Sequence, residues 1–225
     1  MMTLNTIVAE AFDSLAEELS SFAPETFLAQ LQETLKRRIS EHKRIIFNGD
    51  NYSEEWVKEA ERRGLPNLKN TMTALHTLVN EKNVALFEKY GVFSRRELES
   101  RFEIFLEEYH RRIRIEGRLS WEMAATIILP ALRNEYKQTV SALSRALDAK
   151  RTNGTAALQK LADKLGGALD SVVSDLDTLE TALTSCHEDI LAAMSRLRTS
   201  VDAAETLVND RSWPLPKYRE MLFIY

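Results

Sequence analysis

The chain has 225 residues and a formal net charge of −4, with 44% hydrophobic and 28% charged residues. This length suits one large domain or two small ones, and the acidic balance supplies no field to hold nucleic acid or an anionic membrane. The single cysteine excludes an internal disulfide, no apolar run reaches the roughly 20 residues of a membrane span, and early acidic residues interrupt any signal-peptide pattern. We therefore expect a soluble cytoplasmic protein.

Few, long helices are expected, because only 7 glycines and 5 prolines punctuate the chain. Apolar residues across positions 4–19 keep the i, i+3, i+4 spacing of one helix face, and Ala23-Pro24 ends that helix. Pro24 can open a second helix, whose apolar pattern continues to Phe47. Residues 1–47 are the first of four predicted segments.

The second segment, a helical body over residues 48–153, begins with a turn. Asn-Gly-Asp-Asn at positions 48–51 is a turn sequence, after which Ser53 caps a short helix that Gly64 ends. A further helix is predicted from about residue 71 to residue 90.

A longer helix follows within the same segment. Ser94 and Glu97 have the spacing of a capping box, and the apolar pattern then continues through Ile113. Gly117 and Pro130 are predicted to be points where this helix bends or restarts.

The third segment, residues 154–209, is rich in Ala, Leu, Asp, Ser and Thr, and its apolar residues recur every three or four positions. This pattern predicts a long amphipathic arm, as a coiled coil or a hairpin. The arm is either one helix, spanning roughly 60 Å from residue 168 to 209, or a hairpin with its turn near residues 185–188. No β pattern of useful length is present, so the predicted fold is mainly α: a bundle of long helices, this arm and an extended tail.

The fourth segment, residues 210–225, is unusually apolar for a chain terminus, which is normally polar unless it is docked. Its prolines fix φ at alternate positions and predict an extended course. We expect this tail to dock within the chain or to contact another subunit. The candidate structural or interface residues are Trp213, Pro214, Leu215, Pro216, Tyr218, Leu222 and Phe223.

Other residues that could carry chemistry have simpler interpretations. Glu107 and His110 have the Glu-x-x-His spacing of di-iron bundles, but no second such motif exists to complete a site. Cys186 falls on an apolar stripe, where a small buried side chain is the better interpretation. The remaining histidines are expected at the surface or at helix caps: His42, His76 and His187.

Two basic clusters, at residues 36–38 and 110–114, have acidic neighbours along their helices, which favours ion pairing over nucleic-acid contact. The glycine-containing turn at residues 47–51 lacks the pattern of a phosphate-binding loop and follows a helix. No catalytic, cofactor-binding or metal-binding residue is therefore predicted.

Four stretches carry a family resemblance. They are Leu-Asn-Thr-Ile-Val-Ala-Glu-Ala at 4–11, the run Phe-Asn-Gly-Asp-Asn-Tyr-Ser-Glu-Glu-Trp at 47–56 with its continuation to 67, residues 81–92 with 97–101, and Trp-Pro-Leu-Pro-Lys-Tyr-Arg-Glu-Met-Leu-Phe-Ile at 213–224. In these stretches the chain resembles the C-terminal helical region of type III glutamine synthetases, most loosely across about 140–205. One departure is Asn51, which stands where that family usually has glycine; asparagine tolerates a positive φ.

The resemblance implies that the parent enzyme makes glutamine from glutamate, ammonia and ATP, with divalent Mg or Mn. The metal, ATP and glutamate residues of that family lie upstream of the stretch at 4–11, so this chain is expected to be a fragment, a truncation or a separately encoded piece without catalytic residues. The implied partners are the catalytic domain of the same enzyme and further copies in a homo-oligomer. Residues 1–47 would pack on that catalytic domain, leaving Ile7, Val8, Phe12 and Leu15 partly uncovered in the chain alone.

Two functions remain open from the sequence. The first is a structural and assembly region that braces the fold or the oligomer of a glutamine synthetase. The second is a stand-alone helical module that binds a partner through its long arm and is unrelated to nitrogen assimilation.

Deleting residues 212–225 should destabilise the helical body or dissociate the assembly, because burial of each large apolar side chain contributes on the order of 1.5–3 kcal/mol. The check is a melting curve together with a measurement of oligomeric mass. A deletion variant that keeps both values would show that the tail has no such role.

Overall fold

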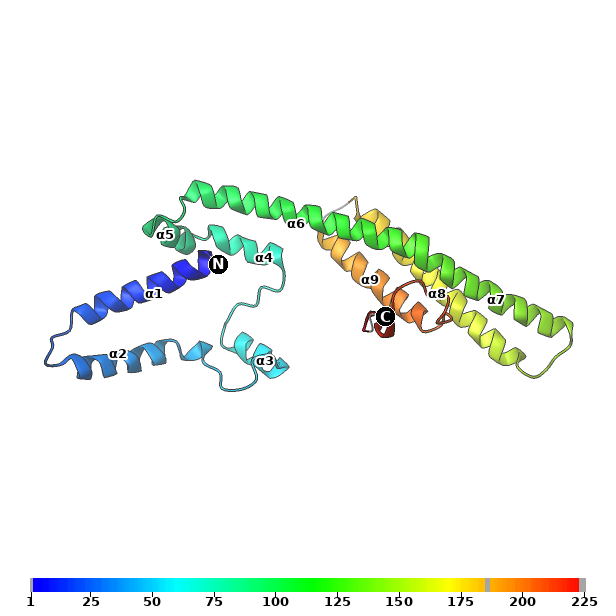
Figure 1. The fold of residues 1–225 in the computed structure, drawn as a ribbon, viewed down its shortest axis with the longest axis horizontal. Coiled ribbons are helices and arrows are strands. Elements are labelled where there is room, and N and C mark those ends of the chain that lie inside the picture. The colour runs from blue at the N-terminus through cyan, green and yellow to red at the C-terminus, as the bar shows by residue number, and fades with distance from the viewer. Residues whose placement is uncertain (1, 185–186, 223–225) are drawn as a thin grey trace. The chain divides into compact units, whose positions relative to one another are not determined.

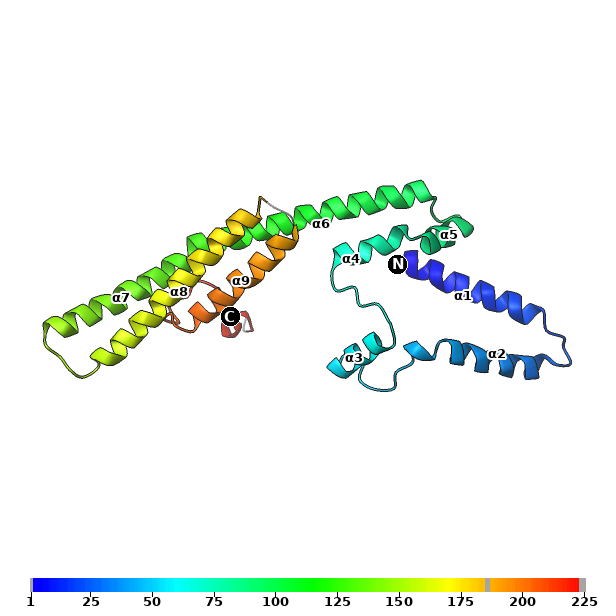
Figure 2. The ribbon, with the colours of Figure 1, turned by 180° about the vertical axis from the view of Figure 1, so that it is seen from behind.

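A computed structural model describes residues 2–184 and 187–222, all of which lie in helices, turns or loops (Figures 1 and 2). The mainly α fold predicted from the sequence is confirmed. The chain divides into two compact units, Met1–Tyr109 and His110–Tyr225, and the boundary falls within one helix. The assignment of separate roles to four segments stays a prediction.

The first unit consists of short and medium helices. In chain order they are α1 (Met2–Ser20), α2 (Phe27–Glu41), the 3₁₀ turn η1 (Lys43–Ile45), α3 (Glu54–Arg62), α4 (Thr71–Leu75), the 3₁₀ turn η2 (His76–Val79), α5 (Glu81–Lys89) and the first part of α6 (Arg95–Met123).

The second unit consists of longer helices. They are the rest of α6, the π-helical turn η3 (Ala124–Ile128), α7 (Leu129–Asp148), α8 (Thr155–Ala182), α9 (His187–Glu205) and the short α10 (Tyr218–Met221). None of the helices in the described ranges is both long enough and apolar enough to cross a membrane.

The predicted helix caps are confirmed. The Ser53 hydroxyl accepts a hydrogen bond from the Trp56 amide at 3.3 Å and so begins α3. Ser94 and Glu97 form the reciprocal capping box, with the Ser94 amide donating to the Glu97 carboxylate at 2.8 Å. Gly64 follows α3 with a φ of +69°, the left-handed conformation that ends many helices.

Two predicted helices are shorter than expected. Pro24 lies in a turn, in which Thr26 N–H donates to Ala23 O, and α2 begins only at Phe27 and ends at Glu41. The helix predicted from 71 to 90 is interrupted at Asn80, whose backbone is extended. Asparagine favours helix starts over helix interiors, and the Asn80 carbonyl accepts the first amide bonds of α5.

The turn at residues 48–51 is held by hydrogen bonds to Asp50 and has no positive φ at Asn51. The Asp50 side chain accepts a hydrogen bond from the Tyr52 amide at 2.9 Å, and its carbonyl accepts one from the Ser53 amide. The positive φ that Asn51 was expected to tolerate is not adopted. An Asx turn therefore replaces the glycine-like conformation.

The first unit has a small core. Val84, Phe87 and Leu98 are almost fully buried, and the side chains that surround them are Leu78, Val92 and Phe93. Most other large apolar side chains of α1 to α3 remain exposed or half-buried. Polar contacts between helices therefore supplement this small core.

Polar contacts attach α1 to α5. Lys89 donates to the Glu10 carboxylate at 2.9 Å, and the Tyr90 hydroxyl lies 2.5 Å from Glu10 and 2.7 Å from Asp13. Lys89 and Tyr90 together lower the pKa of Glu10. The neighbouring carboxylates, Glu10 first, raise the pKa of Tyr90 to about 12, since they disfavour an ionised phenol.

The second unit packs α7, α8 and α9 side by side, with successive helices running in opposite directions (Figures 1 and 2). The segment 154–209 is thus a hairpin of α8 and α9, and the alternative of a single long helix is wrong. The predicted turn at 185–188 lies partly outside the described residues. The core of the unit includes five fully buried side chains: Leu132, Leu165, Val172, Leu179 and Ile190.

Gly117 does not bend α6, contrary to the prediction. A Cβ atom at this position would lie 2.7 Å from Ile190 Cγ2 and 3.1 Å from Leu183 Cδ2. The helix continues past the glycine, which is buried. Gly117 therefore serves close packing between α6 and the α8–α9 hairpin.

At Pro130 the helix restarts, as predicted, without a break in the helical run. The run from α6 to α7 is continuous, and the π-helical turn η3 directly precedes α7, which has Pro130 in its first turn. In a regular helix the proline ring would collide with the carbonyl four residues earlier. A π-helical turn relieves this collision by widening the helix.

Gly117→Ala should destabilise the second unit by about 1–3 kcal/mol, because the added methyl group overlaps the Ile190 side chain. Gly167→Ala is the matched control: no atom lies within 4 Å of its new Cβ, so the change should stabilise α8 by about 0.5–1 kcal/mol. Denaturant unfolding followed by circular dichroism measures both. Equal effects of the two substitutions would contradict the packing role of Gly117.

Candidate interaction surfaces

Exposed apolar side chains on α1 and α2 form an uncovered apolar face of the first unit. Phe12 and Leu28 are 68% and 66% exposed. The other exposed members on the two helices are Leu4, Ile7, Val8, Phe27, Leu35 and Ile39. As expected from the sequence, Ile7, Val8 and Phe12 are uncovered, while Leu15 is half-buried.

Only acidic residues accompany this face as far as Leu35, and the basic residues of α2 begin at Lys36. The first 35 residues contain six acidic residues and no lysine, arginine or histidine: Glu10, Asp13, Glu17, Glu18, Glu25 and Glu33. Contiguous apolar surface with a polar margin is typical of an interaction site. An apolar partner surface with basic residues at its margin would complement this face.

Glu18 joins α1 to α2. Its carboxylate accepts hydrogen bonds from Arg38 at 2.8 Å, from Thr34 at 3.2 Å and from Arg37. Arg37 also pairs with Glu41 one turn along α2. The cluster at residues 36–38 therefore makes the ion pairs expected of a helix face, and Arg38, Arg37 and Thr34 lower the pKa of Glu18.

The family-like stretch at 47–66 forms a local clamp around Trp56. The Phe47 ring stacks on Trp56 with centroids 4.6 Å apart, and the Arg63 guanidinium lies 5.6 Å from the Trp56 centroid. Arg63 donates to the carbonyls of Arg44 at 3.1 Å and Ile46 at 2.8 Å. The clamp thus fixes the chain between α2 and α3.

Two further residues complete the clamp. Glu59 accepts hydrogen bonds from Arg62 and Arg63, and these cations lower the pKa of Glu59 to about 2. A Cβ atom on Gly49 would lie 2.6 Å from Phe47 Cζ, so only glycine allows this ring position. The residues that carry the resemblance here have packing and hydrogen-bonding roles.

The family-like stretch at 81–92 and 97–101 supplies Val84, Phe87 and Leu98 to the core of the first unit. Its Glu81 forms an ion pair at 2.6 Å with Arg95, which lies between the two parts. Gly91 has a φ of +60°, which ends α5. The Arg101 guanidinium lies 4.4 Å from the Phe93 ring centroid.

The C-terminal candidates are found in two environments. Trp213 is 7% exposed and Leu215 is half-buried, while Pro214 and Pro216 are exposed. Leu222 is 73% exposed. The Tyr218 side chain and Phe223 lie outside the described residues, and the interface role of the tail stays a prediction.

Polar contacts hold the start of the tail. The Asn209 amide donates to the Glu135 carboxylate of α7 at 3.4 Å, and the Trp213 amide donates to the Asn209 carbonyl at 3.1 Å. Lys217 forms an ion pair with Asp210 at 2.8 Å. These contacts place Trp213 against the helical body.

The other residues singled out in the sequence do not gather into a site. In the parts of the chain that the structure describes, no three His, Cys, Asp or Glu side chains are grouped closely enough to hold a metal ion. His42 caps the end of α2, and His76 lies 5.2 Å from the Phe102 ring. Cys186 and the His187 side chain fall outside the described residues.

The clamp, and the contacts that join α1 to α2 and to α5, were not predicted from the sequence. The contacts from Glu18 to α2, from Tyr90 to α1 and from Arg63 to two carbonyls join residues 16 to 80 positions apart. Helical spacing carries no signal for such pairs. The aromatic and glycine content of 47–56 was the one visible sign of tight local packing.

Comparison with known proteins gives a family match over this region. Residues 30–149 match the glutamine synthetase C-terminal domain model. This range runs from α2 to the residue after α7 and includes both the clamp and the core of the first unit.

Three curated relatives are similar over most of the chain. The type-3 glutamine synthetase of Dictyostelium discoideum is 30% identical, over 99% of this chain and 33% of the relative. A glutamine synthetase of Butyrivibrio fibrisolvens is 33% identical, over 93% of this chain and 32% of the relative. One from Bacteroides fragilis is 30% identical, over 84% of this chain and 28% of the relative. The chain thus spans about a third of the length of these relatives.

Arg63→Met should speed amide exchange in α3 about tenfold, because two carbonyls lose a charged donor. Arg62→Met is the control, since Arg62 contacts only Glu59 among the described hydrogen bonds and is 73% exposed. Hydrogen-exchange mass spectrometry of both variants makes the comparison. Similar exchange in the two variants would show that the clamp does not depend on Arg63.

Proposed function

The chain belongs to the glutamine synthetase C-terminal domain family, and from that premise we propose that it is the structural and assembly region of a type III glutamine synthetase. In this role it braces the catalytic part of the enzyme and its homo-oligomer. It contributes no catalytic residue. ATP, the divalent Mg or Mn ions and glutamate bind to the remainder of the enzyme.

The observation that carries this proposal is the uncovered apolar face of α1 and α2. Each large side chain there, such as Phe12 or Leu28, gains on the order of 1.5–3 kcal/mol when it is buried. The relatives are about three times as long as the matched region, which leaves two thirds of their length to supply a covering surface. We place the catalytic part of the enzyme on this face.

The internal contacts of the first unit support a bracing role. Polar contacts made by Glu18, Tyr90 and Arg63 fix the positions of α1, α2 and α3. These contacts leave the apolar side chains of α1 and α2 exposed. A surface that is held in place before docking loses less conformational freedom when it binds.

The proposed division of labour is tested first by catalysis. The purified chain should not form glutamine from glutamate, ammonia and ATP with Mg²⁺ or Mn²⁺, because the described residues hold no cluster that would bind two metal ions. Turnover above that of a mock preparation would overturn this part of the proposal.

A chimera tests the bracing role. This chain replaces the matching third of the Butyrivibrio fibrisolvens enzyme, and glutamine formation and oligomeric mass are measured. We expect an active, assembled chimera, and a loss of both properties when Phe12→Asp and Leu28→Asp place charges on the apolar face. Gln32→Asp, on the exposed surface of α2, is the matched control. An inactive parent chimera, or full activity of the Asp variants, would contradict the proposal.

A further inference from the structure

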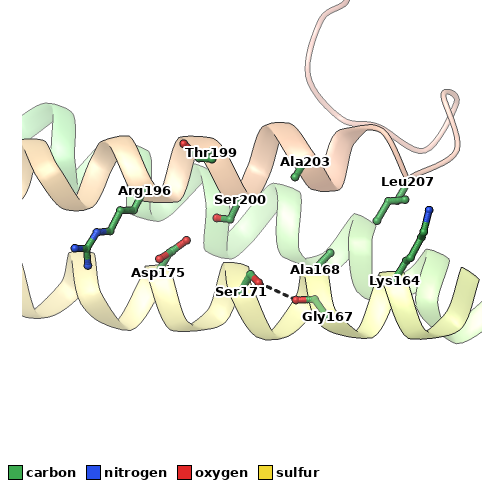
Figure 3. Close-up of a pocket in the computed structure, with 10 residues that line it drawn as sticks. All are labelled: Lys164, Gly167, Ala168, Ser171, Asp175, Arg196, Thr199, Ser200, Ala203 and Leu207. Carbon is green, nitrogen blue, oxygen red and sulfur yellow. Dashed lines mark hydrogen bonds between the residues drawn. The ribbon is translucent and has the colours of Figure 1, made fainter. Parts of the chain in front are cut away.

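A groove of about 600 Å³ runs along the outer side of the α8–α9 hairpin, away from the core of the second unit (Figure 3). Its α8 wall carries Lys164, Ala168, Ser171 and Asp175, and small side chains such as Ala203 continue the wall on α9. Small residues at a helix surface let another helix approach closely.

The hydroxyl groups in this groove need no outside partner. The Ser171 hydroxyl donates to the Gly167 carbonyl at 2.9 Å (Figure 3), and the Ser200 hydroxyl donates to the Leu197 carbonyl at 3.0 Å. Because these donors bond to their own helices, the groove presents mainly methyl and methylene groups. Covering it would leave few polar groups unpaired.

Five residues of α8 line the groove, and four of them, all except Gly167, are arranged symmetrically along the helix. They fall at positions i, i+4, i+7 and i+11, the spacing of a single helix face. Reversing the direction of the helix about the midpoint between Ala168 and Ser171 exchanges Lys164 with Asp175 and exchanges the two small residues. This face is therefore complementary to itself in an antiparallel pair.

We propose that this groove is occupied by α8 of a second copy of the chain, antiparallel to the first α8 and related to it by a two-fold axis. Lys164 of each copy lies opposite Asp175 of the other, and Ala168 lies opposite Ser171. A two-fold interface requires a surface that complements itself in this way. The proposal gives a surface to the assembly role proposed above and rests on it in that respect.

The charges on α8 support this occupant. Within the described part of the chain neither Lys164 nor Asp175 belongs to an ion pair, and the two side chains are roughly 16 Å apart along the helix. They do not neutralise each other within one copy, whereas the antiparallel pair brings them together twice. If α9 instead paired antiparallel with α9 of the second copy, Arg196 would lie opposite Leu207 and its charge would not be matched. The pairing of α8 with α8 is therefore favoured.

The test is a charge swap read by sedimentation equilibrium of the whole chain over a concentration series. Wild type should dimerise, and Lys164→Asp or Asp175→Lys alone should raise the dimer dissociation constant about tenfold, because each change creates two like-charge contacts. The double variant Lys164→Asp/Asp175→Lys should return to the wild-type value. The distance between the two residues within one copy means that such a rescue requires contact between copies.

Two charge reversals outside the groove serve as matched controls: Asp170→Lys on α8 and Arg198→Asp on α9, both at exposed positions. Neither should change the dissociation constant, and circular dichroism should show unchanged helicity in every variant. A monomeric wild type, single variants that associate as wild type does, or a double variant without rescue would each overturn the proposal. The bracing role is tested separately, because the chimera experiment measures it through glutamine formation.

Discussion

The uncovered apolar face of α1 and α2 is the constraint on which this account depends. Exposure of a contiguous surface of large apolar side chains to water is unfavourable, so such a surface tends to be buried. Phe12, Leu28 and Ile39 are each more than half exposed, although they occupy regular helix positions that would normally face a core. The second unit is different, since α7, α8 and α9 close their own core around Leu132, Leu165 and Ile190. The first unit thus leaves large apolar side chains exposed on α1 and α2, whereas the second unit closes a more extensive apolar core.

The polar contacts of the first unit join its helices and fix their orientation. Glu18 joins α1 to α2, and Tyr90 and Lys89 join α1 to α5. None of these contacts covers the apolar side chains. Since exposed ion pairs contribute little stability individually, they orient the helices more than they stabilise them.

The sequence predicted the helices and their caps well because those signals are local. Ser53, Ser94 with Glu97, and Gly64 each act within one helical turn, and all three are found where the pattern placed them. The hairpin of α8 and α9 could not be chosen from the sequence, because the same apolar spacing fits a single long helix. In the structure α8 and α9 form a hairpin, because both helices pack on the same core.

One error concerns a residue whose local preference is overridden by packing. Glycine normally weakens a helix, yet α6 continues through Gly117, whereas at Pro130 the helix restarts as α7 after a π-helical turn. The Ile190 side chain occupies the space that a Cβ of residue 117 would need, and the π-helical turn before α7 accommodates the proline. The docking of the tail stays a prediction; among its described residues Trp213 is buried and Leu222 is exposed.

The most direct measurement of the central claim is amide hydrogen exchange across α1 and α2, in the chain alone and in the assembled chimera. Amides of a helix whose apolar face is uncovered exchange through low-energy local opening, and docking of that face suppresses the opening. Exchange should be fast across residues 5–19 and 28–39 in the chain alone, and at least tenfold slower in the chimera. Slow exchange in the monomeric chain alone, or identical exchange in both states, would contradict it.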